Sequence, residues 1–126
     1  VDLAQGPCVI KRLRGCGAGC EYVAITPEGD IYPCHQFVGN EDYKLGSLYD
    51  GTFDQELSGR FAGLNIYTRE ECRDCWARFY CSGGCSASNL LVNGDIKKPH
   101  RVGCELERKR LECAIALRAI AAGMAE

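Results

Sequence analysis

The stretch CRDCWARFYCSGGC, residues 72–85, arranges its four cysteines as Cys72-x2-Cys75-x5-Cys81-x3-Cys85. In a CxxC pair, the intervening turn directs its amide hydrogens toward two thiolates that bind one ion or cluster. Two such segments close a four-sulfur site, and the glycines at 83 and 84 let the backbone approach an inorganic group without a Cβ clash. The stretch therefore predicts a metal site and leaves the identity of the metal open.

Cysteine is over-represented in this chain, with ten among 126 residues. The length predicts a single domain with a modest core, and the cysteine content is typical of a scaffold held by disulfides or by metal. A secreted protein with five disulfides is the less favoured interpretation, because the cysteines occur in CxxC-type spacings and residues 1–15 show no signal-peptide pattern. We therefore expect a cytoplasmic metal-binding domain.

Charge and hydropathy argue against two kinds of partner. The chain carries 15 Lys and Arg against 17 Asp and Glu, so it lacks the excess of positive charge with which proteins neutralise phosphates. No run approaches the roughly 18 apolar residues that span a bilayer. We expect neither a nucleic-acid partner nor a membrane partner.

Local patterns predict a mixture of strands and helices. Residues 21–26 and 31–32 form a hairpin across a turn at residues 27–30, and residues 43–49 form a further strand. A helix capped by Thr52 runs to residue 63, and Thr68 with Glu71 forms a capping box ahead of Cys72. Residues 76–103 are broken by Gly and Pro and predict loops. Residues 105–122 form an amphipathic helix that covers the core.

A second group of thiols lies upstream, in the spacings Cys16-x3-Cys20 and Gly29-x4-Cys34. In bacterial ferredoxins, cysteines that are close in sequence serve two clusters because the last of them turns toward the other cluster. Cys81 and Cys85 are four residues apart with two glycines between them, so they can project toward different sites in the same way. The sequence therefore predicts two sites that share the downstream cysteines.

The complete pattern resembles the SPASM domain, which is found at the C-terminal end of radical S-adenosylmethionine (radical SAM) enzymes. The matching positions are Cys16-x12-Gly29-x4-Cys34, the four cysteines from Cys72 to Cys85, and Cys104. The resemblance implies a small irregular α+β domain, with a β-hairpin, short helices and a C-terminal helix built around two metal clusters. It assigns residues 1–15 to a linker from a missing N-terminal catalytic barrel, 16–104 to the SPASM domain and 105–126 to a C-terminal capping helix.

The resemblance also implies cofactors and ligands. The family holds two auxiliary [4Fe-4S] clusters with interleaved ligands, which would serve electron transfer and the positioning of a peptide substrate. The first cluster would be held by Cys16, Cys20, Cys34 and Cys85. The second would be held by Cys72, Cys75, Cys81 and Cys104. Cys20 has the least support, because some relatives leave that site open for substrate.

Residues 31–39, preceded by the Cys16-Gly17-Ala18-Gly19 segment, are most similar to the thioether-forming maturases of six-cysteines-in-forty-five-residues peptides. His35 follows the hairpin cysteine where sulfatase-maturating relatives carry an Asp proton acceptor, so sulfatase maturation is disfavoured. Val23 stands where the third cysteine of the radical-forming Cys-x3-Cys-x2-Cys motif belongs. We therefore expect S-adenosylmethionine to bind only in a parent enzyme, with its radical SAM barrel and a cysteine-rich precursor peptide as partners, and whether this chain is itself an enzyme stays open.

Several alternatives remain open. Four thiolates suit structural zinc equally well, in a protein-interaction module that presents the basic C-terminal helix. Cys113 is expected to be a small buried residue, and Cys8 has no assigned role. His35 either is structural or approaches a cluster or substrate. The aromatic side chains between the ligands would either exclude water from one side of a cluster or simply pack in the core; they are Trp76, Phe79 and Tyr80.

Overall fold

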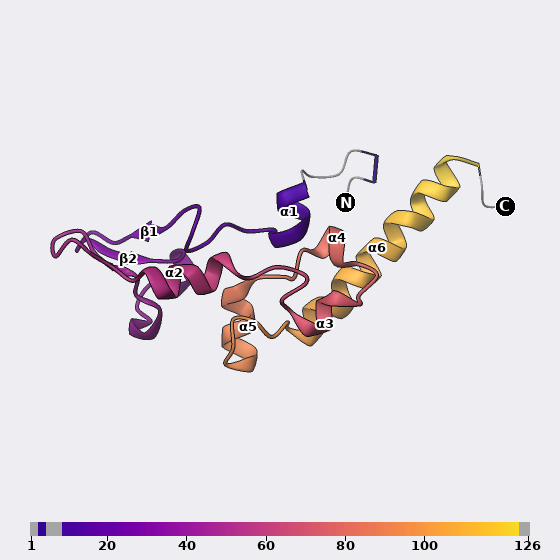
Figure 1. Cartoon of the computed structure of the whole chain (residues 1–126). Helices are drawn as coiled ribbons and strands as arrows, with labels where there is room; N and C mark the ends of the chain where they lie inside the picture. Colours follow the sequence, from indigo (N-terminus) through magenta and orange to yellow (C-terminus); the bar gives the residue numbers. More distant parts are fainter. Residues whose placement is uncertain (1–2, 5–8, 124–126) are drawn as a thin grey trace. The chain divides into compact units, whose positions relative to one another are not determined.

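A computed structural model describes residues 3–4 and 9–123 of the chain (Figure 1). Contacts divide the chain into two compact units, which we call the sheet unit (Cys16–Leu64) and the helical unit (Val1–Gly15 with Asn65–Glu126). The strands found among the described residues all lie in the sheet unit, whereas the helical unit contains helices and connecting loops. This mixture confirms the predicted α+β class.

The sheet unit contains a small antiparallel sheet with the strand order β1-β2-β3-β4. The strands are β1 (Ala24–Ile25), β2 (Asp30–Tyr32), β3 (Gly46–Ser47) and β4 (Thr52–Phe53). The predicted hairpin is confirmed, since Ala24 pairs with Tyr32 and the turn between the strands contains Gly29 at φ +82°. The strand predicted at residues 43–49 is shorter than expected, because Tyr43 ends the 3-10 helix η2 (Glu41–Tyr43).

Three aromatic rings form the centre of the sheet unit. Phe37 ends the 3-10 helix η1 (His35–Phe37), and Phe61 lies in α2 (Gln55–Ala62). The ring centroid of Phe37 is 5.2 Å from that of Tyr43 and 5.4 Å from that of Phe61, in tilted and edge-on geometry. The rings fix α2 and η1, and therefore the segment around Cys34, against each other.

The predicted start of α2 was wrong. Asp54, and not Thr52, is the N-cap, because its Oδ1 accepts the hydrogen bond from the Leu57 amide at 2.9 Å. Thr52 lies in β4, where its Oγ1 accepts a bond from the Ser47 amide at 3.2 Å. The sheet ladder thus uses the hydroxyl that the sequence pattern assigned to the helix.

The helical unit contains α1, α3, α4, α5 and α6. Their bounds are Val9–Arg14, Glu70–Arg73, Arg78–Cys81, Ser86–Asn93 and Arg101–Ala121. The expected loop over residues 76–103 was therefore wrong for α4 and α5. The α1 helix packs against α4, and the Ser82 hydroxyl donates to the Lys11 carbonyl at 2.8 Å. Residues 9–15, expected to be a linker, are accordingly part of this unit.

The capping box expected in the helical unit was wrong, whereas the C-terminal helix is confirmed and covers less of the core than expected. Arg69, and not Thr68, is the N-cap of α3, and the Thr68 Oγ1 instead accepts a bond from the Asn65 amide at 3.0 Å. The C-terminal helix α6 begins at Arg101, and Leu111 is its one buried residue within the part that the structure describes. Leu117, for example, is 67% exposed. The apolar residues of α6 therefore cover the core of this unit only around Leu111.

Candidate metal centre

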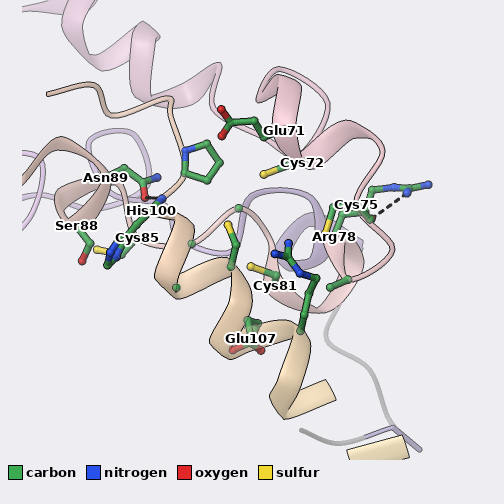
Figure 2. A pocket seen from close by; sticks show the side chains of 17 residues that line it. Glu71, Cys72, Cys75, Arg78, Cys81, Cys85, Ser88, Asn89, His100 and Glu107 are labelled. Carbon is green, nitrogen blue, oxygen red and sulfur yellow. Dashed lines mark hydrogen bonds between the residues drawn. The ribbon is translucent and has the colours of Figure 1, made fainter. Parts of the chain in front are cut away.

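Five cysteine side chains of the helical unit line one cavity of about 320 Å³. They are the four cysteines of the opening motif together with Cys104. Figure 2 shows Cys72, Cys75 and Cys81 directed toward the cavity, and it draws Cys85 apart from them. The fold thus brings together the whole set predicted for the second cluster, and it adds Cys85 to the same cavity.

Short helical turns position the first pair of thiols. Cys72 lies in the single turn of α3 and is buried. The chain then turns, with the Cys75 amide donating to the Cys72 carbonyl at 3.1 Å. Arg78 fixes the other side of this turn, because its Nη1 donates to the Cys75 carbonyl at 3.1 Å (Figure 2). Both sulfurs of the CxxC pair therefore face one cavity from a tightly bonded turn.

The segment between Cys81 and Cys85 is an unusual left-handed loop. Ser82, Gly83 and Gly84 all have positive φ, at 62°, 92° and 74°. Successive amides in such a loop converge on one point and favour an anion there. The backbone amides of Gly83 and Gly84 lower the pKa of Cys81, against the larger effect of burial, and so favour its thiolate. The glycines expected to allow close approach thus also offset part of the effect of burial on a predicted ligand.

The start of α6 supplies Cys104. The His100 amide donates to the Oδ1 of Asn89 at 3.0 Å, and the Cys104 amide donates to the His100 carbonyl at 3.0 Å. Asn89 lies in α5 and is only 1% exposed, so this hydrogen bond is protected from water. The Asn89 side chain therefore ties the first turn of α6, with its cysteine, to the helix that follows Cys85.

Burial disfavours ionised sulfur in the cavity. It raises the pKa of Cys72 to about 11, and it also raises the pKa values of Cys81 and Cys104. Each thiolate further raises the pKa of its neighbours, while Arg69 lowers that of Cys72 and Arg108 lowers that of Cys104. Several thiolates can therefore coexist here only when a cationic group binds them.

The residues around the cavity suit an iron–sulfur group. Soft thiolate donors select zinc, copper(I) or iron–sulfur clusters. A volume of about 320 Å³ exceeds that of a single ion and admits a group of several heavy atoms. The buried Nε of Arg78, at the cavity wall, lacks a hydrogen-bond partner among the described residues, and an acceptor on a bound group would satisfy it. Over residues 3–4 and 9–123, no three Cys, His, Asp or Glu side chains are arranged to hold one metal ion.

The sheet unit holds the remaining predicted thiols. Cys34 is buried at the N-cap of η1, and the Gly19 amide donates to the Pro33 carbonyl beside it at 3.0 Å. Cys16 and Cys20 are exposed on the turn that contains Gly19. The Cys16 sulfur accepts from the Ala18 amide at 3.4 Å and lies 3.1 Å from the Tyr22 hydroxyl. Three of the four ligands predicted for the first cluster are thus in the sheet unit, and Cys85 is in the helical unit.

Other residues singled out in the sequence lie elsewhere. The predicted wall was wrong, because Trp76, Phe79 and Tyr80 are exposed and the cavity is lined instead by residues such as Ala77 and Arg78. Cys113 is exposed rather than buried, since it lies on a face of α6 away from Leu111. His35 is exposed in η1. Cys8 lies outside the described residues.

Sequence reasoning missed two buried polar residues. Arg69 is 3% exposed and Asn89 is 1% exposed. Neither stands in a motif, and a buried position for either residue type is uncommon. Their burial depends on segments remote in sequence, so no local pattern identifies them.

Comparison with known proteins gives a domain-family match. Residues 16–76 match SPASM, described as an iron-sulfur cluster-binding domain. The matched region contains Cys16, Cys20, Cys34, Cys72 and Cys75, and it ends before Cys81. This part of the chain therefore resembles the SPASM iron–sulfur cluster-binding domain.

Curated relatives extend the similarity beyond that match. The chain is 28% identical over 102 residues to a PqqA peptide cyclase of Xanthomonas axonopodis pv. citri, covering 75% of this chain and 27% of the relative. It is 32% identical over 96 residues to mycofactocin maturase MftC of Mycobacterium ulcerans, covering 71% and 25%. A serine-type anaerobic sulfatase-maturating enzyme of Klebsiella aerogenes is 28% identical over 86 residues, covering 66% and 20%. The chain thus spans about a quarter of the length of these relatives.

Proposed function

We propose that this chain is the auxiliary cluster domain of a radical SAM enzyme that modifies a peptide. The observation that carries the proposal is the single cavity that five cysteines of the helical unit line. The match to the SPASM domain and the names of the relatives, a peptide cyclase and two maturases, support it. A radical SAM barrel and a precursor peptide are the corresponding partners, in the cytoplasm. The structure has no helix, in its described part, long and apolar enough to cross a membrane.

The proposal assigns two [4Fe-4S] clusters. Cys72, Cys75, Cys81 and Cys104 would hold the second cluster in the helical unit. The first would be held by Cys16, Cys20, Cys34 and Cys85. When bound, such clusters accept and release single electrons. The cavity holds one thiol more than a [4Fe-4S] cluster needs, which is consistent with Cys85 serving the other site.

The protein's own residues would prepare these sites. Burial of Cys34 and Cys72 excludes water from the ligands, and the backbone amides of Gly83 and Gly84 favour the thiolate of Cys81. Cys16 and Cys20 are exposed, which suits a site that also meets substrate. Thioether formation on a cysteine-rich peptide stays the predicted chemistry within this class. The name of one relative refers to sulfatase maturation, for which this chain has His35 instead of the expected Asp.

Metal analysis tests the proposal. Anaerobically purified chain is expected to contain iron and sulfide in equal amounts, broad visible absorption, and an electron paramagnetic resonance (EPR) signal after reduction by dithionite. Stoichiometric zinc, without sulfide or visible colour after anaerobic iron–sulfur reconstitution, would overturn it in favour of a structural zinc module.

A further inference from the structure

We propose that Arg69 supplies a buried positive charge that stabilises the reduced state of the cluster in the helical unit and so raises its reduction potential. The inference rests on the ligand set proposed above, and it concerns a residue outside that set. Arg69 does not line the cavity. It acts from behind the loop that carries Cys81 and Cys85, as a positioning residue.

Hydrogen bonds fix the guanidinium of Arg69 without neutralising it. The Nη1 atom donates to the carbonyls of Ile96 at 2.7 Å and Lys97 at 2.9 Å, and Nη2 donates to the Ser86 hydroxyl at 3.1 Å. Carbonyl and hydroxyl groups carry partial charges only. Within the described part of the chain, no carboxylate lies within ion-pair distance of Arg69. An arginine keeps its proton even when buried, so the site contains a permanent cation.

Gly83 brings this cation against the cysteine loop. A Cβ atom at Gly83 would lie 2.9 Å from Nε of Arg69 and 3.0 Å from its Cδ. The absence of a side chain therefore allows the guanidinium to contact the backbone between Cys81 and Cys85. The positive charge of Arg69 acts on the thiolates of Cys72, Cys81 and Cys85, and it lowers the pKa of Cys72 against the effect of burial.

The sign of the effect follows from Coulomb's law. Reduction adds one negative charge to a cluster that thiolates already make anionic. A cation at fixed short range stabilises the more negative state more strongly, and burial reduces the screening that weakens such effects at the surface. Removing the charge of Arg69 must therefore lower the reduction potential of the cluster.

The same hydrogen bonds give Arg69 a structural role, which the test must separate from its charge. The Ile96 carbonyl that Arg69 binds also accepts a hydrogen bond from the side-chain Nδ2 of Asn89 at 3.5 Å. The Oδ1 of the same Asn89 side chain holds the start of α6. Arg69 thus links the segments that carry Cys72, Cys85 and Cys104. The substitution Arg69→Lys keeps the positive charge and loses the planar guanidinium fork, whereas Arg69→Gln loses the charge.

The experiment is an EPR-monitored redox titration of the iron-loaded full chain, with dithionite as the electron donor. The relevant signal is the one that disappears in Cys72→Ala. In Arg69→Gln the ratio of oxidised to reduced cluster at a fixed potential is expected to rise about tenfold, which is a shift of about 59 mV for one electron. Arg69→Lys is expected to recover most of this shift. Arg73→Gln removes the same charge from the exposed side of α3 and is expected to change the ratio by less than about threefold.

Each result decides the inference. A lowered potential in Arg69→Gln with recovery in Arg69→Lys supports it, whereas loss of the cluster in Arg69→Gln alone overturns it, because Arg69 then acts on cluster binding. An unchanged potential in Arg69→Gln overturns it. An equal shift in both variants, or loss of the cluster in both, also overturns it, because the planar guanidinium and not its charge then matters. Wild-type chain without iron and sulfide overturns the proposed function itself.

Discussion

At the scale of the residue, the buried thiol of Cys72 depends on a bound group for its charge. Cys72 is buried, and its pKa is raised to about 11 by desolvation, with further increases from the thiolates of Cys81, Cys104 and Cys75. Near neutral pH an isolated thiol at this position keeps its proton. A metal group displaces the proton, so metal content is the direct measure of whether a cysteine is a ligand.

Substitution of one ligand should remove one cluster. Cys72→Ala is expected to lower the iron and sulfide content of the chain by about half, because the other proposed site has a separate set of ligands. Cys113→Ala, at an exposed position on α6, is the matched control and should retain the full content. Iron and acid-labile sulfide analysis of both variants measures this. Equal contents in the two variants would show that Cys72 is not a ligand.

Gly83 should be sensitive to a single added carbon. Gly83→Ala forces alanine to φ +92° and places its Cβ 2.9 Å from Nε of Arg69, so we expect a loss of roughly 2 kcal/mol in unfolding free energy. Gly94→Ala is the control, because Gly94 has φ +69° and nothing within 4 Å of a Cβ. It should lose only about 1 kcal/mol, from backbone strain. Denaturant unfolding of the iron-loaded variants compares them, and equal losses would contradict the steric argument.

At the scale of the element, short helices in this protein begin and end through specific hydrogen bonds and left-handed residues. The α4 helix ends at Ser82 with φ 62°, and α5 ends at Gly94 with φ 69°. The Gly83-Gly84 and Asn93-Gly94 pairs, interpreted from sequence as marks of a loop, instead lie where these helices end. Ser82 therefore caps the end of α4 and also begins the cavity loop.

The N-cap of α2 offers a test at this scale. Asp54→Ala removes the acceptor for the Leu57 amide and is expected to lower the unfolding free energy of the sheet unit by about 1 kcal/mol. Asp50→Ala changes an exposed turn residue of the same type and should alter the free energy by less than about 0.5 kcal/mol. Thermal unfolding followed by far-UV circular dichroism distinguishes the two. A larger loss in Asp50→Ala would show that the cap is not the stabilising interaction.

At the scale of the whole molecule, the chain consists of two small units, each with a modest apolar core and several cysteines. Leu111 is the one buried residue of the 21-residue helix α6 in the described chain, and no β-strand here exceeds three residues. Cores of this size give little stability by themselves. We therefore expect the clusters to contribute a large part of the folding free energy.

Removal of the iron should unfold the chain. Binding at thiolate sites contributes on the order of 10 kcal/mol per site in small metal-dependent domains, because the sites do not exist in the unfolded chain. Chelation under reducing conditions is expected to abolish the helical far-UV circular dichroism signal, and anaerobic iron–sulfur reconstitution should restore it. Iron analysis of the same samples verifies the loss. An unchanged spectrum after complete loss of iron would contradict this expectation.

Much of the fold and part of the candidate site could be predicted, for reasons that differ between residues. The hairpin was predicted because its strands and turn lie within twelve consecutive residues. The shared cavity of Cys72, Cys75 and Cys81 follows from spacing within short turns. The failed predictions, such as the start of α2 and the exposure of Cys113, concern choices between competing partners or faces that no local pattern encodes.

The sequence by itself determined the resemblance to the SPASM domain and the spacing of the cysteines, since both depend on residue type and position along the chain. Only the tertiary structure showed that Cys85 lines the same cavity as the four thiols assigned to the second cluster, and only it buried Arg69 behind Gly83. The physical reason is that the burial of a residue and the electrostatic field around it both depend on segments that are distant in sequence. The Arg69 carbonyl partners, for instance, are 27 and 28 residues away along the chain.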